Sequence, residues 1–156
     1  MSSSIVQNQE ASKQVSALLA KCLATSYVLY TKTQNFHWNV VGARFHSLHE
    51  MFQEQYEELS EALDEIAERI RMIGSKSPGT MKEFLNISAI KEAEGTLSED
   101  QMLQELFQDH ESLIEHLNEW IKEAVELGDE GTADLFIQRI RAHQKMAWMI
   151  RSHFSE

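Results

Sequence analysis

Proline and glycine are scarce in this sequence, which has one proline and six glycines among 156 residues. Both residues interrupt helices, so their scarcity favours long helices over strands and turns. Hydrophobic residues make up 42% of the chain, and this length suits a single domain with a substantial core. The composition therefore predicts an all-α protein.

Cysteine and long apolar runs are also lacking. The single cysteine, Cys22, cannot form a disulfide within one chain, and its place on an apolar helical face predicts a buried structural thiol. No apolar run reaches the length of a membrane span, and the amino-terminal segment resembles no secretion signal. We therefore expect a cytoplasmic protein that does not contact membranes, with residues 1–10 as a flexible polar tail and residues 11–156 as one domain.

Positive charge is the third shortage. The chain has 14 lysines and arginines against 25 acidic residues, a formal net charge of −11, and its first basic residue is Lys13. Such a chain should repel DNA and anionic membranes and should attract cations. DNA binding is therefore an alternative function that the charge of the chain opposes.

Apolar residues recur at helical spacing in four long segments. We expect helices over residues 10–35, 45–73, 98–128 and 133–153, with a turn at residues 40–42. Gly74 and the Ser77-Pro78-Gly79 run end the second helix, and Ser98 to Gln101 forms a capping box that opens the third. The connection over residues 75–97 is too long for a hairpin turn. It suits a four-helix bundle whose second helix crosses over to a parallel third helix, with a short helix over residues 80–87 in the crossover.

The expected core follows these apolar positions. On the second helix they are Leu48, Phe52, Tyr56, Leu59, Leu63, Ile66, Ile70 and Ile73. On the third and fourth helices they include Leu103, Leu106, Leu113, Leu117, Val125, Phe136, Ile140, Ala147 and Trp148.

Four residues around the first turn and along the second helix form a candidate metal-binding set. His37 and His49 flank the turn, and Asp64 and Glu68 lie four positions apart on one face of the second helix. Two imidazoles with two carboxylates suit iron or another borderline divalent metal. Each residue alone would read as an ordinary polar residue, so the prediction depends on the combination.

The spacing of this set indicates how it must assemble. Asp64 follows His49 by 15 positions on one helix, which separates the two by about 22 Å. The histidines and the acids of one chain therefore cannot share a metal ion. A second copy related by a two-fold axis would pair the acids of one chain with the histidines of the other, giving two identical sites per dimer.

A metal site inside one bundle is disfavoured. Di-iron proteins with such a site carry Glu-x-x-His on their helices, and none of the seven histidines of this chain follows a glutamate by three positions.

Two motifs resemble those of the Dps proteins, or miniferritins. These are HWNVVGxxFxxLHxxFxxxY, which begins at His37, and LDEIAERI, which begins at Leu63. The resemblance covers residues 15–153. It implies a ferritin-like four-helix bundle, a hollow twelve-subunit shell built from two-fold dimers, and a di-iron ferroxidase site that His37 and His49 share with Asp64 and Glu68 of the partner chain.

The resemblance also implies a function. Fe(II) would be oxidised, preferably by hydrogen peroxide, and stored as a ferric mineral that limits oxidative stress. Trp38 would lie near the site, where it either packs or quenches oxidising equivalents. One family ligand is missing, because Gln53 stands where the family has Asp or Glu. Gln53 then ligates weakly or through water, and the second iron is held weakly. A shell protein with a weakened ferroxidase site therefore remains an alternative.

Four acids cluster at the turn between the third and fourth helices, namely Glu126, Asp129, Glu130 and Asp134. Around a three-fold axis of a shell they would line a cation pore. Alternatively, they complement the amino-terminal dipole of the fourth helix.

Overall fold

The computed structural model describes Ile5 and residues 8–154, which form helices without strands in this part of the chain. The helices are α1 (Gln9–Asn39), α2 (Phe45–Met72), α3 (Met81–Ile87), α4 (Glu99–Glu126) and α5 (Glu130–Arg151). Most of the predicted tail lies outside the described residues. Gln9, which was assigned to the tail, belongs to α1, and so does Glu10, where the first helix was predicted to begin.

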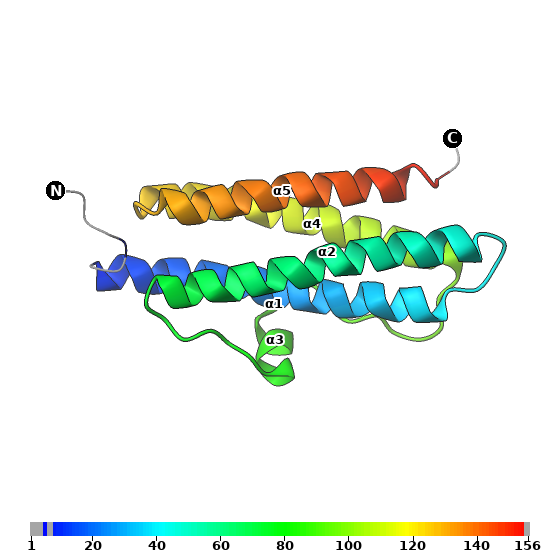
Figure 1. Ribbon diagram of the computed structural model, residues 1–156, viewed down its shortest axis with the longest axis horizontal. Coiled ribbons are helices and arrows are strands. Elements are labelled where there is room, and N and C mark those ends of the chain that lie inside the picture. Colours follow the sequence, from blue (N-terminus) through cyan, green and yellow to red (C-terminus); the bar gives the residue numbers. More distant parts are fainter. Residues whose placement is uncertain (1–4, 6–7, 155–156) are drawn as a thin grey trace.

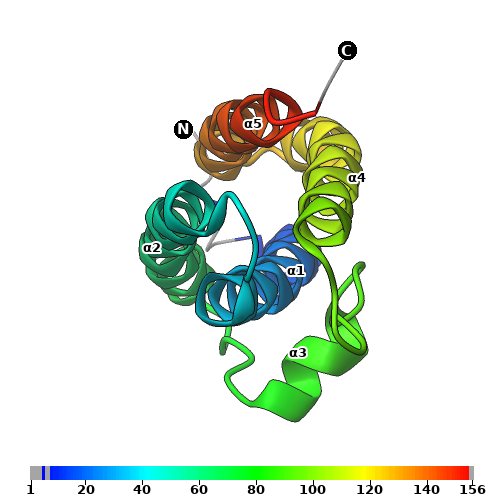
Figure 2. The ribbon, with the colours of Figure 1, turned by 90° about the vertical axis from the view of Figure 1, so that its right-hand side faces the viewer.

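Four of the helices form a bundle. Viewed end-on, α1 lies between α2 and α4, and α5 closes the ring between the same two helices (Figure 2). The crossover connection carries α3, which packs outside the bundle beside α1. Because this connection returns the chain to the end of the bundle where α2 begins, α4 runs parallel to α2 (Figure 1). The predicted four-helix, ferritin-like architecture with a short helix in the crossover is confirmed.

Local side-chain chemistry sets the helix ends. The Asn8 side chain accepts a hydrogen bond from Ala11 at the start of α1, and Gly74 has a positive φ of 99° after α2. Thr80 with Glu83 and Ser98 with Gln101 form capping boxes at α3 and α4. Each cap satisfies main-chain groups that a helix end leaves unpaired.

Two predicted boundaries are wrong. Helix α1 continues to Asn39, so His37 lies inside its last turn. Helix α5 begins at Glu130 instead of Ala133, because Asp129 accepts a hydrogen bond from the Thr132 amide and caps the helix earlier. The turn between α4 and α5 is correspondingly shorter.

The core contains most of the predicted positions. On α2 the apolar stripe from Leu48 to Ile73 is buried, with Tyr56 half-buried. Cys22 is buried as expected, and burial raises the pKa of its thiol to about 11. Val125 and Trp148 were assigned to the core wrongly, because they face outward and are 50% and 54% exposed. None of the helices described here is long and apolar enough to cross a membrane.

Candidate metal site

The α1–α2 hairpin brings His37 and His49 together. Their rings stack with centroids 3.9 Å apart and planes 13° from parallel. The Nδ1 atom of His37 lies 2.7 Å from the main-chain oxygen of His49, and the Nδ1 atom of His49 lies 2.7 Å from the main-chain oxygen of His37. Each histidine is thus held by the backbone of the other.

These reciprocal bonds determine where each ring can bind a cation. A carbonyl oxygen only accepts hydrogen bonds, so both Nδ1 atoms must carry the proton. Each neutral imidazole then has its lone pair on Nε2, the arrangement found in metal-ligating histidines that are oriented by a backbone carbonyl. His37 is buried and His49 is half-buried, and the pair is a candidate two-nitrogen half-site for a cation.

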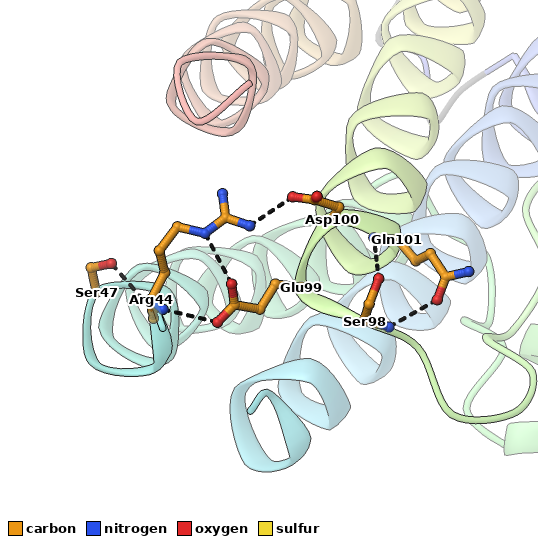
Figure 3. A network of polar contacts seen from close by, with 6 residues as sticks. All are labelled: Arg44, Ser47, Ser98, Glu99, Asp100 and Gln101. Carbon is orange, nitrogen blue, oxygen red and sulfur yellow. Dashed lines mark hydrogen bonds and ion pairs between the residues drawn. The ribbon is translucent and has the colours of Figure 1, made fainter. Parts of the chain in front are cut away.

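An ion-pair network fixes the loop that joins the two histidines. The Arg44 amide and its Nε atom donate to the two carboxylate oxygens of Glu99, each over 2.9 Å, and Arg44 Nη2 donates to Asp100 over 2.6 Å (Figure 3). The carboxylates of Asp100 and Glu99 raise the pKa of Arg44 above its ordinary value. The hairpin is thereby tied to the first turn of α4.

Gly42 lets Glu99 approach this loop. Its φ of 136° is one that other residues rarely adopt, and a Cβ atom added there would collide with the Glu99 carboxylate. Both the backbone conformation and the close approach of Glu99 therefore require a glycine at this position of the hairpin.

The two acids lie elsewhere on α2. Asp64 and Glu68 are both exposed, and Asp64 lines a pocket of about 280 Å³ together with Tyr27, Pro78 and Phe84. Among the described residues, no three histidine, cysteine or acidic side chains are grouped closely enough to hold one metal ion. The histidine pair and the two acids are therefore separate candidate half-sites within one chain.

Gln53 and Trp38 flank the histidine pair in sequence. Gln53 is half-buried, and its amide nitrogen donates to Glu57 over 3.3 Å. The amide oxygen, which is the atom of this side chain that can ligate a cation, is not used in that bond. Trp38 is 64% exposed and follows His37 directly.

The predicted pore acids differ in their surroundings. Glu126, Glu130 and Asp134 are exposed. Asp129 is 3% exposed and pairs with Arg69 over 2.8 Å while it caps α5. The Asp129 carboxylate is therefore paired within the subunit, whereas the carboxylates of Glu126, Glu130 and Asp134 face solvent.

A second histidine pair lies inside the bundle and was missed from the sequence. His110 on α4 and His143 on α5 are fully buried, with their Nδ1 atoms 2.9 Å apart. Desolvation, aided by the Arg139 charge, lowers the pKa of His110 to about 3 and the pKa of His143 well below its ordinary value. His110 falls between Leu106 and Leu113 on the apolar stripe of α4, and that spacing could have revealed its burial.

The chain is similar to known proteins over nearly its whole length. The ferritin-like domain family matches residues 16–156. DNA protection during starvation protein 2 of Bacillus anthracis is 41% identical over 144 residues, which are 92% of this chain and 99% of that protein.

Solved structures give the same result. Dps from Staphylococcus aureus superposes with a TM-score of 0.90 at 40% identity, over 92% of this chain and 97% of that one. A Vibrio cholerae O1 protein described as a member of a superfamily of ferritin-like diiron-carboxylate proteins superposes with a TM-score of 0.87 at 31% identity, over 92% of this chain and 90% of that one.

Proposed function

Since the chain belongs to the Dps family of ferritin-like proteins, we propose that it binds Fe(II), oxidises it and stores the product as a ferric mineral inside a hollow shell. The observation that carries this proposal is the reciprocal bonding of His37 and His49, which leaves two Nε2 lone pairs available for a cation. By removing iron and its oxidant together, this activity would protect a cell against oxidative stress.

The site is completed by a second copy of the chain. Asp64 and Glu68 are exposed on α2 and lie about 22 Å and about 28 Å along the helix from His49. In a two-fold dimer the acids of each chain face the histidine pair of the other, so one dimer holds two sites. Large apolar side chains that a monomer would leave in water support assembly, since Val41 is 74% exposed and Met81 is 61% exposed. Six such dimers would build a twelve-subunit shell.

The ligand types suit the reaction. Neutral imidazoles tolerate Fe(II), whereas carboxylates favour the harder Fe(III) product and can bridge two ions. Hydrogen peroxide is the proposed oxidant, and each molecule takes one electron from each of two Fe(II) ions. Glu126, Glu130 and Asp134, with Asp129 held by Arg69, would form a cation pore for Fe(II) around a three-fold axis.

Two other functions have some support. The name of the Bacillus anthracis relative refers to DNA protection. The net charge of −11 nevertheless opposes direct contact with phosphates, and no lysine or arginine precedes Lys13. Gln53 supports the second alternative, a shell protein whose ferroxidase site is weakened.

Complementation between two inactive variants tests the two-fold site. One chain carries His37→Ala and His49→Ala, and the other carries Asp64→Ala and Glu68→Ala. Each variant alone should lose site-dependent Fe(II) oxidation. Mixed dimers should regain one intact site, because one chain supplies both acids and the other supplies both histidines.

The measurement is peroxide-dependent ferric absorbance after dissociation, mixing and reassembly. Different affinity tags on the two chains identify the mixed assemblies, and each variant reassembled alone is the control. If purified mixed assemblies oxidise iron no faster than the parents, the cross-subunit site is wrong.

A further inference from the structure

The three tyrosines of this chain lie in one continuous line of aromatic contacts. Tyr27 and Tyr30 on α1 meet edge-on with ring centroids 5.7 Å apart, and Tyr30 meets Tyr56 of α2 at 5.9 Å. Tyr56 in turn meets the edge of His37 at 5.3 Å. These separations are those of aromatic rings in contact. The line Tyr27–Tyr30–Tyr56 is called the tyrosine line below.

The tyrosine line joins the two half-sites of one chain. At one end Tyr56 contacts His37, whose ring stacks on His49. At the other end Tyr27 stacks on Phe84 of α3 at 4.4 Å and lines the same pocket as Asp64. Phenylalanine has no phenol to oxidise, so the oxidisable segment consists of the three tyrosines.

In the two-fold dimer the tyrosine line also connects the two iron sites. This step rests on the function proposed above. The histidines of one chain belong to one iron site, and its acids belong to the other. The tyrosine line of each chain therefore runs from the first site to the second, and a dimer contains two such lines in opposite directions.

The reaction needs a second electron at each site. Reducing hydrogen peroxide to water takes two electrons, and one Fe(II) supplies one. A site with neutral Gln53 in place of an acid holds its second iron weakly, because a neutral oxygen binds a hard cation less well than a carboxylate. A peroxide molecule that reacts at a singly occupied site is one electron short.

We infer that the tyrosine line carries this second electron between the two iron sites of a dimer. In the first step Fe(II), hydrogen peroxide, one tyrosine and one proton give Fe(III), a tyrosyl radical and two water molecules. In the second step the radical takes an electron from Fe(II) at the other site and a proton from solvent, which restores the tyrosine. The sum is two Fe(II), one peroxide and two protons giving two Fe(III) and two water molecules, and no hydroxyl radical is released.

The positions of the tyrosines allow the proton steps. All three rings are half-buried, so a phenolic proton can pass to water while the ring stays in contact with its neighbours. The Tyr30 hydroxyl also accepts a hydrogen bond from Gln34 Nε2 over 3.4 Å. Replacing tyrosine by phenylalanine keeps the ring contacts and removes the phenol.

The experiment measures tyrosyl radicals by electron paramagnetic resonance in the assembled protein after one addition of hydrogen peroxide. Fe(II) is loaded at half of the site concentration and then at the full site concentration. The radical signal should be strong at half loading, where many dimers have no second Fe(II). It should fall severalfold at full loading, because iron at the second site reduces the radical.

The variant Tyr27→Phe/Tyr30→Phe/Tyr56→Phe should lose the signal and release several times more spin-trapped hydroxyl radical. Trp148→Phe, which changes an exposed aromatic residue on α5, is the matched control and should behave as wild type. Circular dichroism and assembly size confirm that each variant folds.

Ferric absorbance recorded in the same samples separates the two proposals. Without peroxide-dependent ferric absorbance in wild type, the proposed function fails, and the tyrosine line fails with it. Ferric absorbance without a tyrosyl signal overturns the tyrosine line alone. A signal that rises in proportion to iron up to full loading, or that survives in the triple variant, also overturns it.

Discussion

Gln53 stands at the position where the resemblance to the Dps family implies an acid, and its contacts make the effect of a neutral residue testable. It follows His49 by one helical turn, so the two side chains lie on one side of α2. Its amide nitrogen is bonded to Glu57, and only a neutral oxygen remains for a cation. The two iron positions of the proposed site should therefore differ in affinity.

Gln53→Asp should tighten the weaker position. An added carboxylate favours iron, and we expect the second ion to bind about tenfold more tightly, which corresponds to about 1.4 kcal/mol. Isotherms under anaerobic conditions and stopped-flow oxidation of Fe(II) provide the measurements. Gln144→Asp, at an exposed position of α5, adds the same charge away from the site and should change neither. Two equally tight ions in wild type would show that the neutral ligand is unimportant.

The candidate ligands could be proposed from the sequence because each side chain has its own chemistry and lies at a recognisable spacing, and their role as ligands stays a prediction. The tyrosine line could not be proposed from the sequence, although the spacing of its residues can be read there. Tyr27 and Tyr30 are three positions apart, and Tyr56 follows His49 by two helical turns, so each pair shares a helical face. Which face of α1 meets which face of α2 depends on the geometry with which the two helices cross. A single sequence does not specify that geometry.

The α1–α2 hairpin is the element that holds the histidine pair, and it depends on a contact from α4. Glu99 bonds the Arg44 amide and side chain and occupies the space that the missing side chain of Gly42 leaves open. Asp100 bonds only the exposed end of Arg44 and is itself 72% exposed. These neighbours offer a matched pair of substitutions.

Glu99→Ala should destabilise the subunit by about 1–3 kcal/mol, because it leaves the Arg44 amide and Nε without their acceptor. Asp100→Ala removes an acid from the same helical turn, so both variants lose the same dipole interaction, but it should cost at most about 1 kcal/mol. Urea unfolding gives the two free energies, and Fe(II) affinity should weaken in Glu99→Ala alone. Equal effects of the two substitutions would show that the Arg44 network does not position the histidines.

Helix boundaries were predicted well where the capping residue was recognised in the sequence and poorly where it was not. Ser98 with Gln101 gave the start of α4 correctly. Asp129 was read as part of a turn, yet it caps α5 and moves its start to Glu130. Trp148 has the spacing of a core residue, but its exposed fraction of 54% reflects the rotation of α5 within the bundle.

The molecule as a whole combines an acidic surface with a buried, uncharged histidine pair. His110 and His143 share one hydrogen bond between their Nδ1 atoms, so one must donate and the other must accept. A proton on the acceptor would place two N–H groups against each other, next to the charged Arg139. The core therefore favours two neutral rings.

Acid should destabilise the fold through this pair. Both pKa values are lower in the folded state than the ordinary 6.5, so below that pH the unfolded chain binds protons that the folded chain does not. Each histidine then removes up to about 1.4 kcal/mol of unfolding free energy per pH unit. For His110 this loss continues down to a pH of about 3.

Denaturant unfolding at fixed protein concentration between pH 7 and pH 5 measures this loss. His110→Gln/His143→Gln keeps hydrogen-bonding groups without a titration in this range, so its stability should fall less steeply with pH. His116→Gln, at a half-buried position on α4, is the control and should retain the wild-type slope. Identical slopes for all three proteins would assign the acid sensitivity to other groups.

The division of the chain into two hairpins affects its synthesis. His37, His49, Gln53, Asp64, Glu68 and the tyrosine line all belong to α1 and α2, whereas α4 and α5 contribute none of them. A ribosome therefore synthesises every proposed ligand before it translates α4 and α5. Until they follow, α1 and α2 can pack only against each other, and the apolar surface that α4 and α5 cover stays exposed. This first hairpin is therefore the segment of the nascent chain that most needs a chaperone.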